Sequence, residues 1–170
     1  DYVAAPASAE LLFLRHMPDS ALKPYFNILR TVVLTSRHEM DPDMMVEASL
    51  KLDVHGNVEH TAAGGFGPVH ALDRALRRAL TRWYPELEQM HLIDYKVRVL
   101  SPTRTNIPDA AEENGTGSNV RVLIESSDGV ASWTTVGVSY SIIEASLEVL
   151  ADAVTCKLYK TEQARWRAEC

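Results

Sequence analysis

The sequence feature that most constrains the fold is an internal repeat. A turn, a strand, a glycine and an amphipathic helix follow one another twice along the chain. Gly56 and Gly64 in the first copy match Gly129 and Gly137 in the second, and the members of both pairs are separated by the same offset. Two similar units that each leave one face of a sheet uncovered are expected to pack on each other.

Each copy contains three expected strands and one helix. Alternating or Val- and Thr-rich stretches predict the strands, and small or apolar residues at helical spacing predict the helices. The expected strands cover residues 25–35, 48–54 and 57–64 in the first copy and 93–101, 120–126 and 132–138 in the second. The predicted fold class is α+β, with two βββα units packed as a pseudo-symmetric sandwich that is expected to dimerise.

The predicted boundaries follow from turn and helix-stop residues. Residues 1–24 are expected to form a linker with a short helix over 9–17, and residues 36–43 a polar loop. Unit one covers 25–84, because Pro85 is expected to stop its helix near Tyr84. Unit two covers 92–158, with its helix capped by Ser141 and Glu144. Together the units form a domain over 25–160, with a charged tail over 161–170 and a Pro-, Asn- and Gly-rich loop over 101–118.

Composition excludes several classes of function. The formal charge of −6 argues against nucleic-acid binding, because such surfaces need clustered Lys and Arg. No apolar run approaches the roughly 18–20 residues that span a bilayer. Two cysteines and the lack of a signal-peptide pattern predict a reducing, cytoplasmic compartment without disulfides. Because the sequence starts without Met, we interpret it as a piece of a longer polypeptide.

No catalytic or metal-binding constellation can be assembled from these residues. The six histidines form neither a His-x-His nor a His-Glu-x-x-His pair, and the cysteines lack metal-ligand spacing. We therefore expect no metal and no catalytic residue, and a free-standing enzyme is the weakest hypothesis. His70 is expected in the first turn of the first long helix, facing a glycine corner, although a solvated surface histidine is the commoner role for such a residue.

The two strand-to-helix corners are the candidate binding features. Gly64, Gly65 and Gly67 form the first corner and Gly137 lies in the second. The first corner lacks the Lys-Ser/Thr of a P-loop, so glycines that let a strand turn sharply into a helix are the simpler explanation. Both corners nevertheless lead to a helix N-terminus, whose free N–H groups favour a carboxylate. A pair of such corners can hold a carboxylate metabolite.

Four ordered motifs carry a family resemblance: HTAAGGFGPVHAL at 60–72, DYKVRVL at 94–100, GTG at 115–117 before VRV at 120–122, and TVGVS at 135–139 with IIEAS at 142–146. In them the chain resembles the C-terminal regulatory domain of the 2-isopropylmalate synthase and citramalate synthase family, and most closely its citramalate branch. The resemblance implies a homodimer of two-unit βββα domains that binds leucine or isoleucine, end products of branched-chain amino acid biosynthesis, at the dimer interface. It places acetyl-CoA-dependent catalysis, with a divalent metal, in a separate TIM-barrel domain.

The resemblance also implies a set of effector-binding positions. The start of the first helix, the long fourth strand, the strand after the loop and the second corner would supply them. The implied residues are Val69, His70, Leu92, Tyr95, Val99, Thr116, Val120, Tyr140 and Ile142. No cofactor is implied for this domain, whose role would be feedback inhibition of the parent transferase.

Three departures from the family pattern bear on that role. Phe66 stands where the family commonly has Asn, so a large ring is expected near the pocket. Ser141 stands where Asn or Asp is frequent, and the 101–118 loop is longer than usual. The alternative hypothesis is therefore a dimerisation domain of the same enzyme that has lost effector binding.

Overall fold

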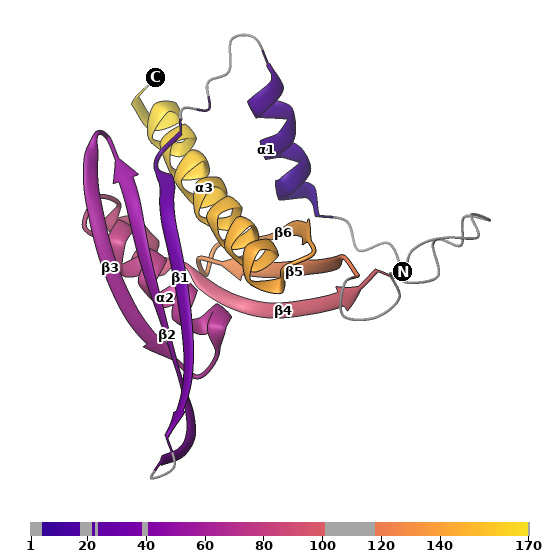
Figure 1. Ribbon diagram of the computed structural model, residues 1–170. Helices are drawn as coiled ribbons and strands as arrows, with labels where there is room; N and C mark the ends of the chain where they lie inside the picture. The colour runs from indigo at the N-terminus through magenta and orange to yellow at the C-terminus, as the bar shows by residue number, and fades with distance from the viewer. Residues whose placement is uncertain (1–4, 18–21, 23, 39–40, 101–117, 170) are drawn as a thin grey trace, which may run out of the picture.

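The computed structural model describes residues 5–17, 22, 24–38, 41–100 and 118–169 (Figure 1). Two three-stranded antiparallel sheets form its framework, with strand orders β1-β2-β3 and β4-β5-β6. The strands are β1 (Asn27–His38), β2 (Asp41–Val54), β3 (Asn57–Gly65), β4 (His91–Val99), β5 (Val120–Ser127) and β6 (Ser132–Ser139). The β2–β3 hairpin turns through His55 and Gly56, both at positive φ, as a two-residue turn of this kind requires.

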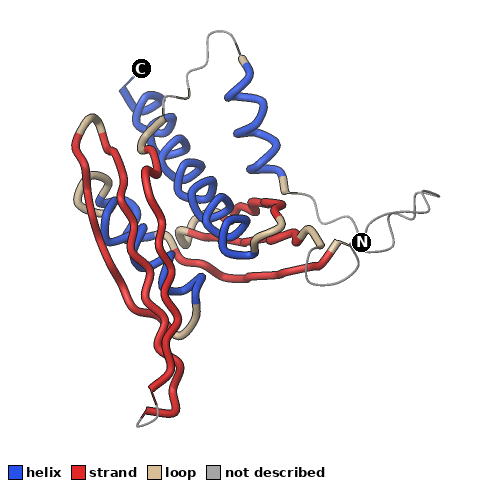
Figure 2. The backbone as a smooth tube through the Cα atoms, in the orientation of Figure 1, coloured by secondary structure: helices blue, strands red, loops and turns tan. Residues whose placement is uncertain are grey.

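Each sheet is covered on one face by the helix that follows it. Helix α2 (Pro68–Leu80) packs on β2 and β3, helix α3 (Ile142–Glu169) packs on β5 and β6, and the two helices contact each other. The short 3-10 helix η1 (Pro85–Gln89) joins the units, and α1 (Pro6–His16) lies along α3 and β6 (Figure 2). The expected α+β fold of two βββα units is confirmed.

The structural repeat has an offset that is longer by one than the glycine match indicates. The Thr61 hydroxyl donates to the carbonyl oxygen of Ala75 at 3.0 Å, and in unit two the Thr135 hydroxyl donates to that of Val149 at 3.1 Å. Each buried residue of α2 has a buried counterpart in α3, and the two are separated in the sequence by the same number of residues as Thr61 and Thr135. They are Ala71, Leu72, Ala75, Leu76, Ala79 and Leu80, and Ala145, Ser146, Val149, Leu150, Ala153 and Val154.

An error of one position matters in a strand, because side chains alternate between the two faces. Gly137 is therefore equivalent to Ala63 and faces α3. Gly64 lies on the exposed side of β3, and Gly65 lies against α2. The matching of Gly64 with Gly137 in the sequence was thus wrong in register, although the repeat itself is present.

Three predicted boundaries were also wrong. The polar loop expected over 36–43 is largely strand, since β1 reaches His38 and pairs it with Asp41. Helix α2 ends at Leu80, before Tyr84, and Pro85 begins η1. Helix α1 begins at Pro6 and not at residue 9. A proline fits the first turn of a helix because an N–H group at that position would have no intrahelical partner. The loop expected over 101–118 lies almost entirely outside the described residues.

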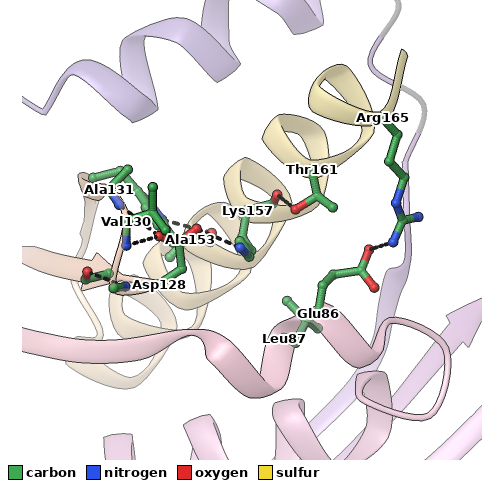
Figure 3. Close-up of polar contacts among 12 residues, drawn as sticks. Glu86, Leu87, Asp128, Val130, Ala131, Ala153, Lys157, Thr161 and Arg165 are labelled. Carbon is green, nitrogen blue, oxygen red and sulfur yellow. Dashed lines mark hydrogen bonds and ion pairs between the residues drawn. The ribbon is translucent and has the colours of Figure 1, made fainter. Parts of the chain in front are cut away.

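The charged tail expected over 161–170 instead continues α3 to Glu169. Two side chains of this extension contact residues of unit one and of η1. The Tyr25 hydroxyl donates to Glu162 at 2.5 Å, and Arg165 lies 3.4 Å from Glu86 (Figure 3). These contacts connect the end of α3 to the first unit and to η1.

The contact between Tyr25 and Glu162 gives a modest stability prediction. We expect Glu162→Gln and Tyr25→Phe each to lower the free energy of unfolding by about 1 kcal/mol, the usual net value of one hydrogen bond. Chemical denaturation of both variants and of the double variant measures the coupling. Fully additive effects would show that the contact contributes nothing.

Candidate functional site

The start of α2 presents unpaired backbone donors. Pro68 is the first helical residue, Gly67 precedes it, and no side chain caps the helix. The first intrahelical bond runs from the N–H of Ala71 to the carbonyl of Gly67 at 3.0 Å. The N–H groups of Val69 and His70 consequently have no partner within the helix and lie at its positive end.

Two pockets lie beside this helix start. The larger, of about 860 Å³, is lined by Val69, His70, Asp73, Arg77, Thr81, Glu88, His91, Leu92 and Tyr95. The smaller, of about 310 Å³, is lined by Gly67, Pro68, Val69, His70, Tyr95, Ile142 and Ile143. Val69, His70 and Tyr95 belong to both. The smaller pocket joins the starts of α2 and α3, so both units contribute to it.

Five of the nine implied effector residues line these pockets. Val69, His70, Leu92 and Tyr95 line the larger, and Ile142 joins three of them in the smaller. Val99, Val120 and Tyr140 line neither of them, and the side chain of Tyr140 is 71% exposed. Thr116 lies outside the described residues.

A β-bulge in β4 explains how Leu92 and Tyr95 reach the same pocket. The pairing of β4 with β5 shifts between Leu92 and Asp94. The extra residue puts Leu92 and Tyr95 on one side, although their separation of three would place them on opposite faces of a regular strand. Ile93, which a regular strand would place on the same face as Tyr95, is 57% exposed. The hydroxyl of Tyr95 hydrogen-bonds the Ser146 hydroxyl of α3 at 3.1 Å.

Sequence reasoning missed the polar end of the larger pocket. Asp73 and Arg77 of α2 and Thr81, its C-cap residue, recur at every fourth position, a signal that the sequence did contain. The Nε of Arg77 donates to both carboxylate oxygens of Asp73, at 2.9 and 3.0 Å. Its Nη1 donates to the carbonyls of Leu87, at 3.3 Å, and Met90. Arg77 thereby fixes the segment around η1 against α2. The helix η1 itself could not be expected from its sequence.

This bridging predicts an effect of a conservative substitution. Arg77→Lys keeps a positive charge beside Asp73 but loses the fork that reaches the two carbonyls. We expect the free energy of unfolding to fall by about 1–2 kcal/mol. Urea denaturation measures this loss of stability. Arg78→Lys is the control, because Arg78 is exposed and donates one long hydrogen bond, to the carbonyl of Ala62 at 3.4 Å. Equal losses in the two variants would contradict the assigned role.

Two of the departures from the family pattern are single residues, Phe66 and Ser141, and the structure describes both. Phe66 is 98% exposed and lines neither pocket, and its ring stacks on His70 with 5.4 Å between ring centroids. Ser141 caps α3, because its hydroxyl accepts from the N–H of Glu144 at 3.3 Å. The Glu144 carboxylate does not close the expected capping box; it accepts from the Ser139 hydroxyl at 2.6 Å.

Metal and thiol chemistry find little support in the described part of the chain. No three His, Cys, Asp or Glu side chains among the described residues are placed to hold a metal ion. Cys156 is buried, and burial raises the pKa of its thiol to about 11, so the thiolate is disfavoured near neutral pH. Within the described ranges no helix is long and apolar enough to cross a membrane.

Fold and site together describe a two-unit α+β domain with a pocket between its helix starts. Residues 4–158 match the family described as the LeuA allosteric (dimerisation) domain, and the chain belongs to this family. The family resemblance in the four motifs is therefore confirmed.

Among the relatives compared, the chain is more similar to citramalate synthases than to a 2-isopropylmalate synthase. It is 46% identical to an (R)-citramalate synthase of Aquifex aeolicus (strain VF5), over 95% of this chain and 28% of that protein. Identity to the (R)-citramalate synthase of Geobacter sulfurreducens is 42%, with the same two coverages. A 2-isopropylmalate synthase of Aquifex aeolicus is 29% identical over 81% of this chain and 23% of that protein. The chain spans about 28% of the length of its citramalate synthase relatives.

Proposed function

We propose that this domain is the feedback sensor of an acetyl-CoA-dependent citramalate or 2-isopropylmalate synthase and that it binds isoleucine or leucine. The observation that carries the proposal is the convergence of Val69, His70 and Tyr95 on both pockets at the start of α2. A largely apolar pocket with a few fixed polar groups suits a small branched ligand.

The chemistry of the pockets matches the parts of an amino acid. The free N–H groups of Val69 and His70 favour the carboxylate. The apolar walls from Leu92, Tyr95 and Ile142 suit a branched side chain, and Glu88 at the polar end suits the ammonium group. Asp73 is already paired with Arg77 and contributes less.

The relatives are named as citramalate and 2-isopropylmalate synthases, and we extend the proposal to a longer parent protein of this kind. The parent protein would be a cytoplasmic homodimer with the effector at the dimer interface. Its condensation reaction would take place in a separate TIM-barrel domain that binds acetyl-CoA and a divalent metal. The present chain would supply regulation, with no nucleic-acid or membrane partner. The family description as an allosteric and dimerisation domain agrees with this division.

Thermal unfolding with isoleucine, leucine, valine and no ligand tests the proposal. A ligand that binds only the folded state, at about 100 times its Kd, adds roughly 2.7 kcal/mol and raises the midpoint by several degrees. We expect a selective rise with isoleucine for a citramalate-type sensor and with leucine for an isopropylmalate-type one. No rise with any amino acid at millimolar concentration would contradict effector binding.

One observation favours the alternative, a dimerisation domain without effector binding. The N–H of Phe66 donates to Nδ1 of His70 at 3.3 Å, and the two rings stack, so His70 is engaged by its own corner. Under this alternative the native chain shows no ligand-induced shift, and Phe66→Asn restores one. Under the sensor proposal both proteins respond to the amino acid.

A further inference from the structure

The offset that relates Thr61 to Thr135 allows the surroundings of the two units to be compared position by position. In unit two, α1 covers the free edge of β6 and lies along α3 (Figure 1). The Ser8 hydroxyl accepts from the N–H of Val136 at 2.9 Å, and Arg15 pairs with Asp152 at 2.6 Å. Two apolar residues of α1 are buried on the side of this helix that packs on β6 and α3. They are Ala7 and Leu11.

The equivalent place in unit one is a groove with no helix in it among the described residues. Ala62 and Arg78 are the counterparts of Val136 and Asp152, and they line a groove of about 380 Å³ between the free edge of β3 and α2. Arg74 donates to the carbonyl of Gly64 at 2.7 Å and Arg78 to that of Ala62 at 3.4 Å. In the described part of the chain neither arginine forms a salt bridge.

The charges of the two places are inverted. The edge of α3 beside α1 carries the exposed residues Glu144 and Glu148 and the buried residue Asp152, and the basic residue Arg15 pairs with Asp152. The counterparts on α2 are His70, Arg74 and Arg78. The two units thus offer similar edge-strand grooves. One is acidic and is covered by a helix that brings an arginine; in the other, Arg74, Arg77 and Arg78 outnumber the single carboxylate of Glu47.

The groove is lined by three arginines and one carboxylate, together with small residues of β3: Glu47, Ala62, Ala63, Gly64, Arg74, Arg77 and Arg78. We propose that this groove binds an acidic amphipathic helix of a partner protein. The helix would lie as α1 lies in unit two, with a carboxylate at the place of Arg15 and small residues against the strand. The α1 helix of a second copy is a poor occupant, because Arg15 would then meet Arg78. The inference is independent of the proposed effector site.

Binding of a designed helical peptide tests the proposal. The probe has the sequence of residues 5–17 with Arg15→Glu, held helical by a lactam between positions 12 and 16, which are exposed in α1. The lactam is needed because short isolated helices are marginal in water. Fluorescence anisotropy with the whole chain is expected to show saturable binding, at least tenfold tighter than for the same peptide with Arg15 retained.

A variant in which one charge of the groove is reversed, Arg78→Glu, shows whether the peptide binds in this groove or at another site. Arg78→Glu is expected to weaken the acidic peptide at least tenfold and to reverse the preference toward the Arg15 peptide. Arg30→Glu makes the same change of charge on the outer face of sheet β1-β2-β3 and should leave binding unchanged. Absence of binding, or equal affinity for native and Arg78→Glu chains, would overturn the proposal. A change in oligomeric state by light scattering without peptide binding would instead identify an interface between copies, and also overturn it.

Discussion

Asp128→Ala is expected to lower the free energy of unfolding by about 3 kcal/mol or more, because it leaves a buried lysine without its counter-charge. The Nζ of Lys157 lies 2.6 Å from Asp128, and its side chain is only 8% exposed (Figure 3). The other carboxylate oxygen of Asp128 accepts from the N–H groups of Val130 and Ala131 at 3.0 and 2.9 Å. One side chain thus holds both the β5–β6 turn and α3, and chemical denaturation measures its contribution.

A matched variant distinguishes charge pairing from turn formation. Lys157→Met removes the buried cation and leaves Asp128 with its two backbone donors. We expect it to destabilise the domain by less than half as much as Asp128→Ala. Equal losses would show that the cost lies in breaking the pair rather than in an unpaired lysine.

The same carboxylate predicts a pH dependence. Burial alone would raise the pKa of Asp128, but the bonds from Lys157, Ala131 and Val130 outweigh it and lower the pKa to about 2, from 3.8. A group with a lowered folded-state pKa stabilises the fold above its unfolded pKa and loses that effect as pH falls. The contribution should be complete above about pH 5 and lost between about pH 4 and 2. Asp128→Asn should flatten this part of the stability profile.

Gly65→Ala is expected to cost about 2–3 kcal/mol, a large effect for one methyl group. A Cβ at Gly65 would lie 2.5 Å from the backbone nitrogen of Ala71 and 2.9 Å from its Cα. Backbone atoms of a packed helix cannot yield as a side-chain end can, so α2 must move away from its sheet.

Gly64→Ala provides the control for this prediction. A Cβ at Gly64 meets only the carbonyl oxygen of Val46, at 3.7 Å, which is an ordinary contact. We expect a change within about 0.5 kcal/mol, or a small gain from the less flexible unfolded chain. Thermal or urea unfolding of both variants decides the matter. Equal losses would mean that the close approach of α2 is not what requires a glycine.

The repeat made the architecture predictable from the sequence. The exact alignment of the two units, residue against residue, was not predictable. Helical spacing from Ala71 to Leu80 and from Ala145 to Val154 is a strong signal, because it recurs over several turns. The glycine match placed Gly64 over Gly137, although the structural requirement for glycine falls at Gly65 in unit one. Close approach of a helix backbone depends on tertiary packing, which a sequence pattern does not record.

The candidate site was predictable where it depends on helix starts. The place of His70 follows from Pro68, which marks the first turn of α2, whereas Val69 was named as a site residue through the family resemblance. Arg77 and the η1 segment depend on contacts between distant parts of the chain, and the bulge near Leu92 depends on pairing with β5. The extension of α3 beyond residue 160 was missed because its charged sequence hides the contacts with Tyr25 and Glu86.

Isothermal titration of the chain with isoleucine and with leucine is the most direct measurement of effector binding. We predict saturable heat for at least one of them at millimolar or lower concentration. Val69→Asp, which puts a carboxylate at the helix start, should weaken the binding at least tenfold. Val58→Asp, the same change at an exposed position of β3, should not. No heat with either amino acid, or unchanged affinity in Val69→Asp, would contradict the account.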